Sequence, residues 1–190
     1  WGWRVPFLFG LVIGIVGLFL RRHLVDEVPA PTLKPPVVVV FQKHLPLLFN
    51  ISGLVFLNAV GFYLIFVYLV TWFEVAEKFT PSLALNINSI SMVILIGVVL
   101  LSGYFTDKVG KKLMLQITSM LMLLFVVPLF YFMNHHDVNL AFFGQLGLTI
   151  ILGSYLAPLN AFMVLSIPEA VRCTTIGLGY NLTLGLAGGL

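Results

Sequence analysis

The chain has 190 residues, of which 60% are hydrophobic and only 9% are charged, with a formal net charge of +3. An ordinary soluble domain has about 25% charged residues, so most of this surface must face lipid rather than water. The basic residues are spread along the chain, which argues against nucleic acid as a partner. The single cysteine, Cys173, excludes an internal disulfide and a multi-cysteine metal site.

The first predicted span covers residues 6–20, with Pro6 near the helix start, where its missing N–H costs little. Residues 21–44 form a polar linker whose prolines argue against a long helix. Within it, the apolar run 37–41 is too short to span a membrane and could begin a helix on the membrane surface. The chain opens with Trp1 and ends within an apolar run. We therefore expect a portion of a longer membrane protein; a truncated gene product is the alternative.

Four further apolar segments have the length of about 20 residues that a membrane span requires. They cover residues 45–73, 82–103, 113–133 and 140–167, and a last, unfinished span begins near Thr175. Thr80 and Pro81 are expected to cap and begin the second of these segments. Pro128 and Pro158 are expected to kink the third and fourth. The sequence thus predicts an all-α integral membrane protein.

The densest charged stretch, residues 103–112, lies between two of these spans and reads G-Y-F-T-D-K-V-G-K-K. We interpret it as a tight interfacial loop, in which Gly103 and Gly110 permit close backbone approach and a sharp turn. Lysines anchor such loops on the cytoplasmic side of a membrane. Asp107 is the only acidic residue of this stretch.

The distribution of positive charge predicts the orientation of the chain. If the linker 21–44 is cytoplasmic, the loops 104–112 and 168–174 lie on the same side. That side then carries Arg21, Arg22, Lys34, Lys43, Lys108, Lys111, Lys112 and Arg172. The opposite side carries only Arg4 and Lys78. The positive-inside rule therefore favours this topology.

No Asp, Glu, Lys or Arg lies deep in any predicted span. Ion-coupled carriers usually need a titratable group near the membrane midplane. If this protein moves protons, that group is expected outside these 190 residues.

Polar residues in the spans give two interpretations, lining of a substrate cavity or hydrogen bonding between packed helices. Asn50, Asn58, Gly61 and Tyr68 fall within an arc of about 80° on an ideal helix, and Asn58 is the leading cavity candidate. In the span 82–103 we favour packing for the scattered polar residues. These are Asn86, Asn88, Ser89 and Ser91. Further cavity candidates in the span 140–167 are Gln145, Thr149, Ser154 and Asn160.

A metal site is not expected, because the adjacent His135 and His136 point in different directions on most backbones. A solvated loop containing these residues and Asp137 is the better interpretation. No Gly-rich phosphate loop, nucleophile elbow or paired catalytic carboxylate is visible, so no cofactor and no enzyme activity are predicted.

Three stretches resemble the metabolite–proton symporters of the major facilitator superfamily, which include proline/betaine, citrate, 2-oxoglutarate and shikimate carriers. The stretch G-W-R-V-P-F at 2–7, with L-R-R at 20–22 and D-E-V-P at 26–29, resembles the sixth helix and its exit. The charged stretch 103–112 resembles the loop between helices eight and nine. The stretch P-E-A-V-R-C-T at 168–174, running into G-L-G-Y-N at 177–181, resembles the approach to helix eleven.

This resemblance implies a chain that covers helix six to the start of helix eleven of a twelve-helix carrier. Residues 1–20 would be the last helix of the N-terminal half, 21–44 the cytoplasmic linker, and 45–190 the C-terminal half. The last part would hold four full spans and the beginning of a fifth.

The resemblance also implies roles for particular residues. Asp107 would meet a helix N-terminus of the opposite half and hold the cytoplasmic side shut. The other residues of this gating group would be Gly103, Lys108, Gly110, Lys111, Lys112, Glu169 and Arg172. For the lysines, simple topological anchoring is an equally strong interpretation.

The implied function is a secondary active transporter in the bacterial inner membrane that moves a small polar metabolite, zwitterion or carboxylate by alternating access. Proton symport is expected, with a small-molecule substrate, protons and the lipid bilayer as partners. The sequence leaves the oligomeric state open. The alternatives are a sugar or drug carrier of the same superfamily, or a non-transporting membrane remnant.

Overall fold

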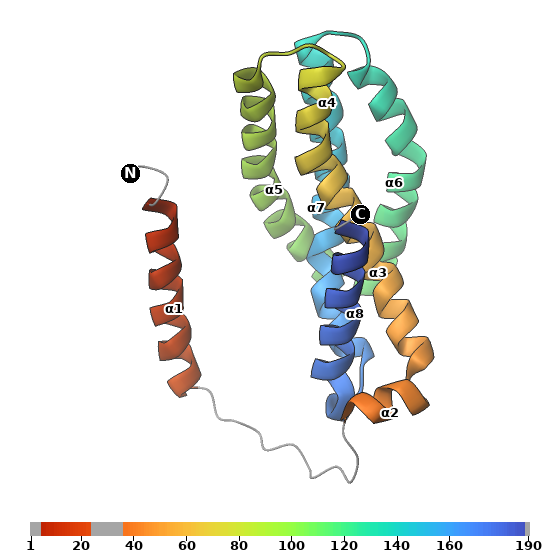
Figure 1. Ribbon diagram of the computed structural model, residues 1–190. Helices are drawn as coiled ribbons and strands as arrows, with labels where there is room; N and C mark the ends of the chain where they lie inside the picture. The colour runs from red at the N-terminus through yellow and green to blue at the C-terminus, as the bar shows by residue number, and fades with distance from the viewer. Residues whose placement is uncertain (1–4, 24–35, 189–190) are drawn as a thin grey trace. The chain divides into compact units, whose positions relative to one another are not determined.

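The computed structural model describes residues 5–23 and 36–188, and every regular element within these ranges is a helix. The chain divides into two compact units, Trp1–Leu33 and Lys34–Leu190. In the first unit, helix α1 (Val5–His23) covers the predicted span 6–20. The second unit contains all the remaining helices (Figure 1). The predicted linker residues 24–35 lie outside the described residues.

The second unit begins with the short helix α2 (Pro36–Lys43), which includes the apolar run of the linker. The next helix is continuous over Leu45–Val75 but changes its winding on the way. Its three parts are α3 (Leu45–Tyr63), the π-helical turn η2 (Leu64–Tyr68) and α4 (Leu69–Val75). It is followed by α5 (Pro81–Val109), α6 (Lys111–Met133), α7 (Val138–Ser166), the 3₁₀ turn η3 (Glu169–Val171) and α8 (Arg172–Gly188).

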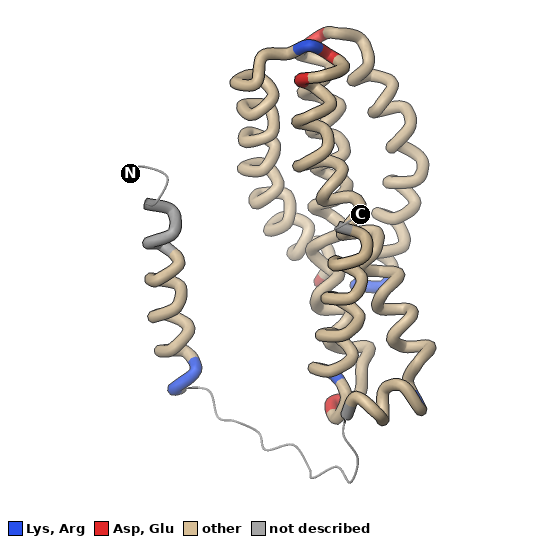
Figure 2. Tube along the Cα trace, in the orientation of Figure 1, with Lys and Arg blue, Asp and Glu red and all other residues tan. Residues whose placement is uncertain are grey.

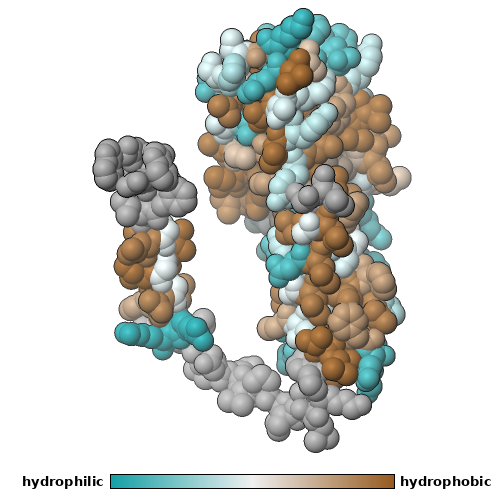
Figure 3. Space-filling model, in the orientation of Figure 1, coloured by the Kyte–Doolittle hydropathy of each residue, from teal (hydrophilic) through white to brown (hydrophobic). Residues whose placement is uncertain are grey.

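Four helices in the described residues are long and apolar enough to cross a membrane: Leu45–Val75, Pro81–Val109, Lys111–Met133 and Val138–Ser166. Charged residues lie at the helix ends and in the connections between them (Figure 2). Apolar side chains predominate on the visible sides of the helices, with weakly polar and hydrophilic groups among them (Figure 3). These findings confirm the prediction of an all-α membrane fold.

Local sequence explains where several helices begin. Thr80 is the N-cap of α5 in an extended conformation, and Pro81 follows as its first residue, as predicted. Asp137 caps α7 by accepting a hydrogen bond from the backbone N–H of Asn139 at 2.8 Å. The solvated loop predicted to contain His135, His136 and Asp137 therefore ends in the N-cap of α7.

The predicted loop over 104–112 is much shorter in the structure. Helix α5 continues to Val109 and α6 starts at Lys111, so Gly110 alone makes the turn. Its φ of 99° lies in a region that L-residues with a side chain rarely adopt. Gly103 lies inside α5, and no atom of the structure lies within 4 Å of where its Cβ would be. The turn at Gly110 is confirmed, whereas the described residues show no close approach at Gly103.

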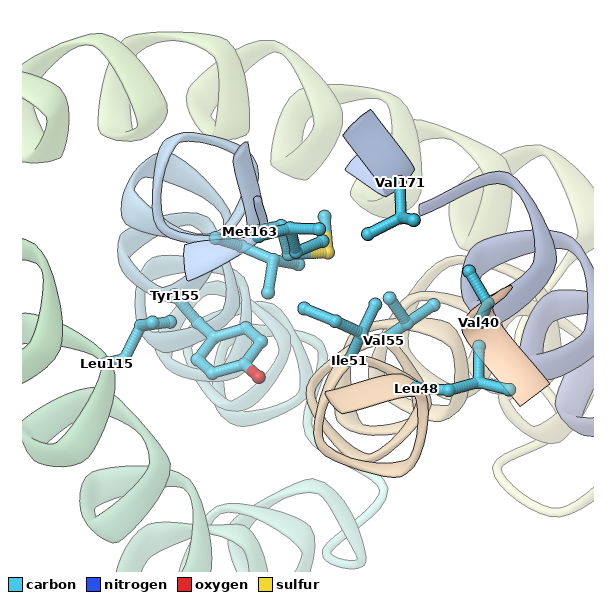
Figure 4. Close-up of a cluster of buried hydrophobic side chains, with 10 residues drawn as sticks. Val40, Leu48, Ile51, Val55, Leu115, Tyr155, Met163 and Val171 are labelled. Carbon is cyan, nitrogen blue, oxygen red and sulfur yellow. The ribbon is translucent and has the colours of Figure 1, made fainter. Parts of the chain in front are cut away.

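Two separate clusters of buried hydrophobic side chains hold the second unit together. The α2-end core consists of Val40, Leu48, Ile51, Val55, Leu115, Tyr155, Leu159, Met163, Ile167 and Val171 (Figure 4). The α4-end core consists of Ile65, Phe66, Leu69, Phe73, Ala84, Ile87, Met133, Ala141, Leu148 and Leu152. Helix α7 contributes to both cores, packing mainly against α5 and α6, while α3 packs mainly against α8.

Glycines allow the closest helix contacts. A Cβ at Gly153 would lie 2.9 Å from both Leu95 Cδ1 and Val98 Cγ1, so α5 packs directly on the α7 backbone there. A Cβ at Gly61 would lie 2.9 Å from Leu152 Cδ1. Small residues at such positions are the usual means of close helix packing in membranes.

Candidate functional site: buried amides beside a π-helical turn

The π-helical turn η2 interrupts the helix that runs from α3 to α4. The backbone N–H of Leu69 bonds to the carbonyl of Leu64, five residues earlier. This wider winding changes the regular pairing of backbone carbonyls, and π-helical turns are frequent at functional sites. The side chains of Ile65 and Phe66, within the turn, are buried in the α4-end core.

Two amide side chains from other helices bind the carbonyls of this turn. Asn88 Nδ2 of α5 donates to Phe66 O at 3.2 Å, and Gln145 Nε2 of α7 donates to Ile65 O at 3.1 Å. Gln145 Nε2 also donates to Asn88 Oδ1 at 2.9 Å. The two amides, which we call the amide pair, therefore link three helices through a connected hydrogen-bond network.

The amide pair is almost completely shielded from the surroundings. Gln145 has 0% of its surface exposed and Asn88 has 9%. One turn further along each helix, Ser91 and Thr149 are both 0% exposed. Thr149 Oγ1 donates back to Gln145 O at 2.8 Å. In the described residues, Gln145 Oε1 and Ser91 Oγ have no hydrogen-bond partner.

This cluster contains no titratable side chain. It can hold backbone carbonyls or a small polar molecule by hydrogen bonding, but none of its groups can exchange a proton near neutral pH. Sequence reasoning treated Asn88 as packing and gave Gln145 as one cavity candidate among several. Neither residue was paired with the other, because no local pattern connects positions on different helices.

Asn58, the leading cavity candidate, lies on α3 and is 7% exposed. Its Oδ1 is buried and has no hydrogen-bond donor within the described part of the chain. One turn earlier, Leu54 O accepts a hydrogen bond from Tyr155 Oη at 2.8 Å. Figure 4 shows the Tyr155 hydroxyl directed toward α3. The unpaired Asn58 Oδ1 therefore lies one helical turn from the Tyr155 hydroxyl, which has a hydrogen-bond partner.

Three of the other cavity candidates, Asn50, Tyr68 and Asn160, are not gathered around Asn58. Asn50 is exposed and lines a groove at the α2 end, together with Lys43, His44, Pro46, Leu47, Ser166 and Pro168. Tyr68 is 57% exposed and lies within the π-helical turn. Asn160 is exposed on α7. The single arc drawn on an ideal helix is therefore split, with Asn58 and Gly61 buried and Asn50 and Tyr68 exposed.

The predicted gating residues lie near the turn at Gly110 and the start of α8. Asp107 and Lys112 are exposed and Lys111 is partly buried. Lys108 Nζ lies 4.4 Å from the centre of the Tyr104 ring, a cation–π contact. No donor in the described residues binds the Asp107 carboxylate, so its side chain is free to meet a partner.

At the start of α8, Glu169 and Arg172 approach to 3.9 Å. The Glu169 side chain is 87% exposed, so the pair contributes little to stability. Arg172 Nε also donates to Ile167 O at 3.2 Å, which ties the end of α7 to this turn.

The histidine-containing loop has a role that the sequence did not indicate. Glu77, whose side chain is only 1% exposed, accepts from the backbone N–H of His136 at 2.8 Å and contacts His136 Nδ1 at 2.7 Å. His135 Nδ1 instead lies 2.8 Å from Tyr131 O, and Asp137 caps α7. The three adjacent side chains thus have separate partners, and the connection after α4 is joined to the connection before α7.

Comparison with known proteins places the chain in a family. The family model described as Major Facilitator Superfamily matches residues 1–190. The chain is 26% identical to a glycine betaine/proline/ectoine/pipecolic acid transporter from Dickeya dadantii, over 99% of this chain and 41% of that protein. It is 29% identical to a putative proline/betaine transporter from Staphylococcus haemolyticus, over 100% of this chain and 42% of that protein.

A proline/betaine transporter from Escherichia coli K12 is 24% identical over 99% of the chain and 41% of its own length. The chain therefore spans less than half the length of these curated relatives. No solved structure matches it significantly. With a family model that covers its full length and four helices of membrane-spanning length, the chain belongs to the major facilitator superfamily, as a multi-pass bacterial membrane protein.

Proposed function

We propose that this protein is part of a secondary active transporter that moves a small polar zwitterion or carboxylate across the bacterial inner membrane. The observation that carries this proposal is the match along the whole chain to relatives that are named transporters of proline and betaine. The helices support it, because their buried polar groups are uncharged amides and hydroxyls, which suit a substrate with no large net charge. Transport proceeds by alternating access, as in carriers built from two helical halves.

Within such a carrier, α1 is the last helix of the N-terminal half, and the cytoplasmic linker predicted at 21–44 begins after His23, where α1 ends. Residues 45–190 form the C-terminal half. The long helix of α3, η2 and α4 is then helix seven, and α5, α6, α7 and α8 are helices eight to eleven. The packing of α3 on α8 and of α5 on α7 is consistent with a compact helical half.

Asp107 acts as a gate at the cytoplasmic end. Its carboxylate is exposed beside the tight turn at Gly110 and has no partner in the described residues. A carboxylate at a helix N-terminus gains about 0.3–1 kcal/mol. Such a contact with the opposite half is weak enough to break in each transport cycle. Lys108, Lys111 and Lys112 supply positive charge beside it.

Coupling to protons requires a titratable group outside the described spans. Among the described residues, the buried charged side chain is Glu77, which lies in a connection rather than in a span. If the transporter is coupled to protons, we expect the titratable group to lie outside these 190 residues.

The test is uptake of radiolabelled L-proline and glycine betaine by proteoliposomes containing the full-length protein, with and without a protonophore. Uptake that the protonophore abolishes supports proton symport. Asp107→Asn is expected to lower the transport rate several-fold while the protein still inserts and purifies normally. If sugars or drugs compete and zwitterions do not, the carrier belongs to another substrate class; if nothing is transported, the proposal fails.

A further inference from the structure

Asn58 has an unusual position in the packed structure. It lies on α3 between the two cores, since Val55 belongs to the α2-end core and Ile65 to the α4-end core. Nearby Gly61 is closed off by Leu152 and Met122. The Asn58 amide therefore lies near the middle of a helix 31 residues long, far from both of its ends.

An unpaired acceptor at this depth needs an explanation. Burying a carbonyl oxygen without a donor is unfavourable, and nearly all buried polar atoms in proteins have a partner. The Tyr155 hydroxyl reaches α3 one turn before Asn58, but it donates its hydrogen bond to Leu54 O. In the described residues no other donor reaches Asn58 Oδ1. Leucine has nearly the same shape and would avoid this cost. Asn58 therefore lowers the stability of the fold relative to a leucine at the same position.

We propose that Asn58 Oδ1 accepts a hydrogen bond from the ammonium group of the substrate, and that it makes the carrier prefer zwitterions with an N–H over quaternary ones. The proposal rests on the transport function proposed above and adds the substrate group that Asn58 recognises. An amide carbonyl can only accept, so its partner must be a donor. A secondary or primary ammonium supplies one, whereas a quaternary ammonium has no N–H.

The chemistry predicts discrimination against substrates that have no N–H. A hydrogen bond to a charged donor is stronger than a neutral one, and the unpaired Oδ1 makes the loss of the donor more costly. A site built to bind an N–H rejects an analogue without it more strongly than it rejects a small change in size. The named substrates of the Dickeya dadantii relative include proline, which has N–H groups, and glycine betaine, which has none. The preference between these two classes is thus a property that one side chain could set.

The experiment uses one carbon skeleton with a decreasing number of N–H groups. The probes are L-proline, N-methyl-L-proline and N,N-dimethyl-L-proline, which carry two, one and no N–H as zwitterions. Their apparent affinities are measured by competition for uptake into proteoliposomes that contain the full-length protein or a variant. For the unmodified protein, affinity is expected to fall by about tenfold from the first probe to the last.

The variant Asn58→Leu is expected to remove most of this tenfold difference, because both kinds of ammonium then face an apolar side chain. Asn181→Leu is the matched control. Asn181 is exposed on α8, and its Nδ2 already donates to Gly177 O at 2.8 Å. The control should keep the full discrimination.

The thermal stability of the Asn58→Leu variant gives a second, independent test of the proposal. Because Asn58→Leu removes an unpaired buried acceptor, the purified variant should unfold at a temperature equal to or higher than that of the unmodified protein. A clear fall in that temperature, or failure to fold, would mean that Asn58 has a structural partner, and it would overturn the proposal. If the unmodified protein transports proline but Asn58→Leu keeps the same tenfold difference in affinity, Asn58 does not bind the ammonium group of the substrate. If no probe is transported, the proposed function itself is wrong.

Discussion

The two cores of the second unit are similar in size but are held together differently. The α2-end core is almost entirely aliphatic, and among its few polar links are the bonds from Tyr155 to Leu54 O and from Arg172 to Ile167 O. The α4-end core surrounds the π-helical turn, the amide pair and two buried atoms without partners. In a bilayer, apolar contact is poorly selective, because lipid chains are as apolar as leucine. The polar links therefore determine which helices associate at the α4 end, whereas shape does so at the α2 end.

The strongest test of this difference is Gln145→Leu. This change leaves Ile65 O and Asn88 Oδ1 without their donor, so we expect a loss of about 3 kcal/mol in the free energy of unfolding. Thermal or detergent unfolding of the purified protein measures it. Gln116→Leu is the matched control, because Gln116 is exposed on α6, and its effect should be near zero. Equal effects of the two variants would show that the amide pair does not stabilise the α4 end.

Gly144→Ala tests how tightly the α4-end core is packed. A methyl group at Gly144 would overlap Met133 and come within 3.1 Å of the Leu129 carbonyl oxygen. Overpacking of this kind is expected to cost about 2 kcal/mol, measured by the same unfolding experiment. Gly97→Ala, where no atom lies within 4 Å of the added methyl, should instead stabilise α5 by about 0.5 kcal/mol. A neutral Gly144→Ala would mean that α6 can move away from α7 at no cost.

The carboxylate contacts at the two ends, Glu77 with His136 and Glu169 with Arg172, allow a direct comparison by double-mutant cycles. Glu77→Gln combined with His136→Ala should give a coupling of about 1 kcal/mol, because one partner is buried. Glu169→Gln combined with Arg172→Ala should give a coupling close to zero, because that pair is long and exposed. Equal coupling energies would show that the burial of Glu77 does not strengthen its interaction with His136.

The smallest effect is expected for Tyr155→Phe in the α2-end core. Leu54 O lies within α3 and keeps its helical hydrogen bond, so no acceptor is left unpaired. We expect a loss of about 0.6 kcal/mol, typical of a hydrogen bond between membrane helices. A loss as large as that of Gln145→Leu would remove the contrast between the two cores.

Apolar length predicted the helices well, because each span is a long, nearly uncharged segment. The span predicted over 140–167 corresponds to α7 (Val138–Ser166), and the pair Thr80-Pro81 begins α5 as expected. The same signal failed at 104–112, where polar residues remain helical on both sides of Gly110. Hydropathy reports where a chain leaves the apolar environment, but a helix can continue beyond that point.

The candidate site was less accessible to sequence reasoning. Asn88 and Gln145 come from different helices and meet only after α5 packs on α7. The arc through Asn50, Asn58 and Tyr68 assumed 3.6 residues per turn throughout. The π-helical turn at Leu64–Tyr68 breaks that assumption for Tyr68, whereas Asn50 and Asn58 lie before the turn. Which roles these side chains have in binding or gating stays a prediction for the experiments above.

That turn has a consequence for sequence alignment. A π-helical turn holds about one residue more than an α-helical turn, so residues after Tyr68 are rotated by about 100° relative to an uninterrupted helix. The turn is therefore equivalent to a one-residue insertion. A homologue with a continuous α-helix at this level would be aligned correctly only with a one-residue gap between Leu64 and Tyr68. An ungapped alignment there would match buried positions of α4 to lipid-facing ones.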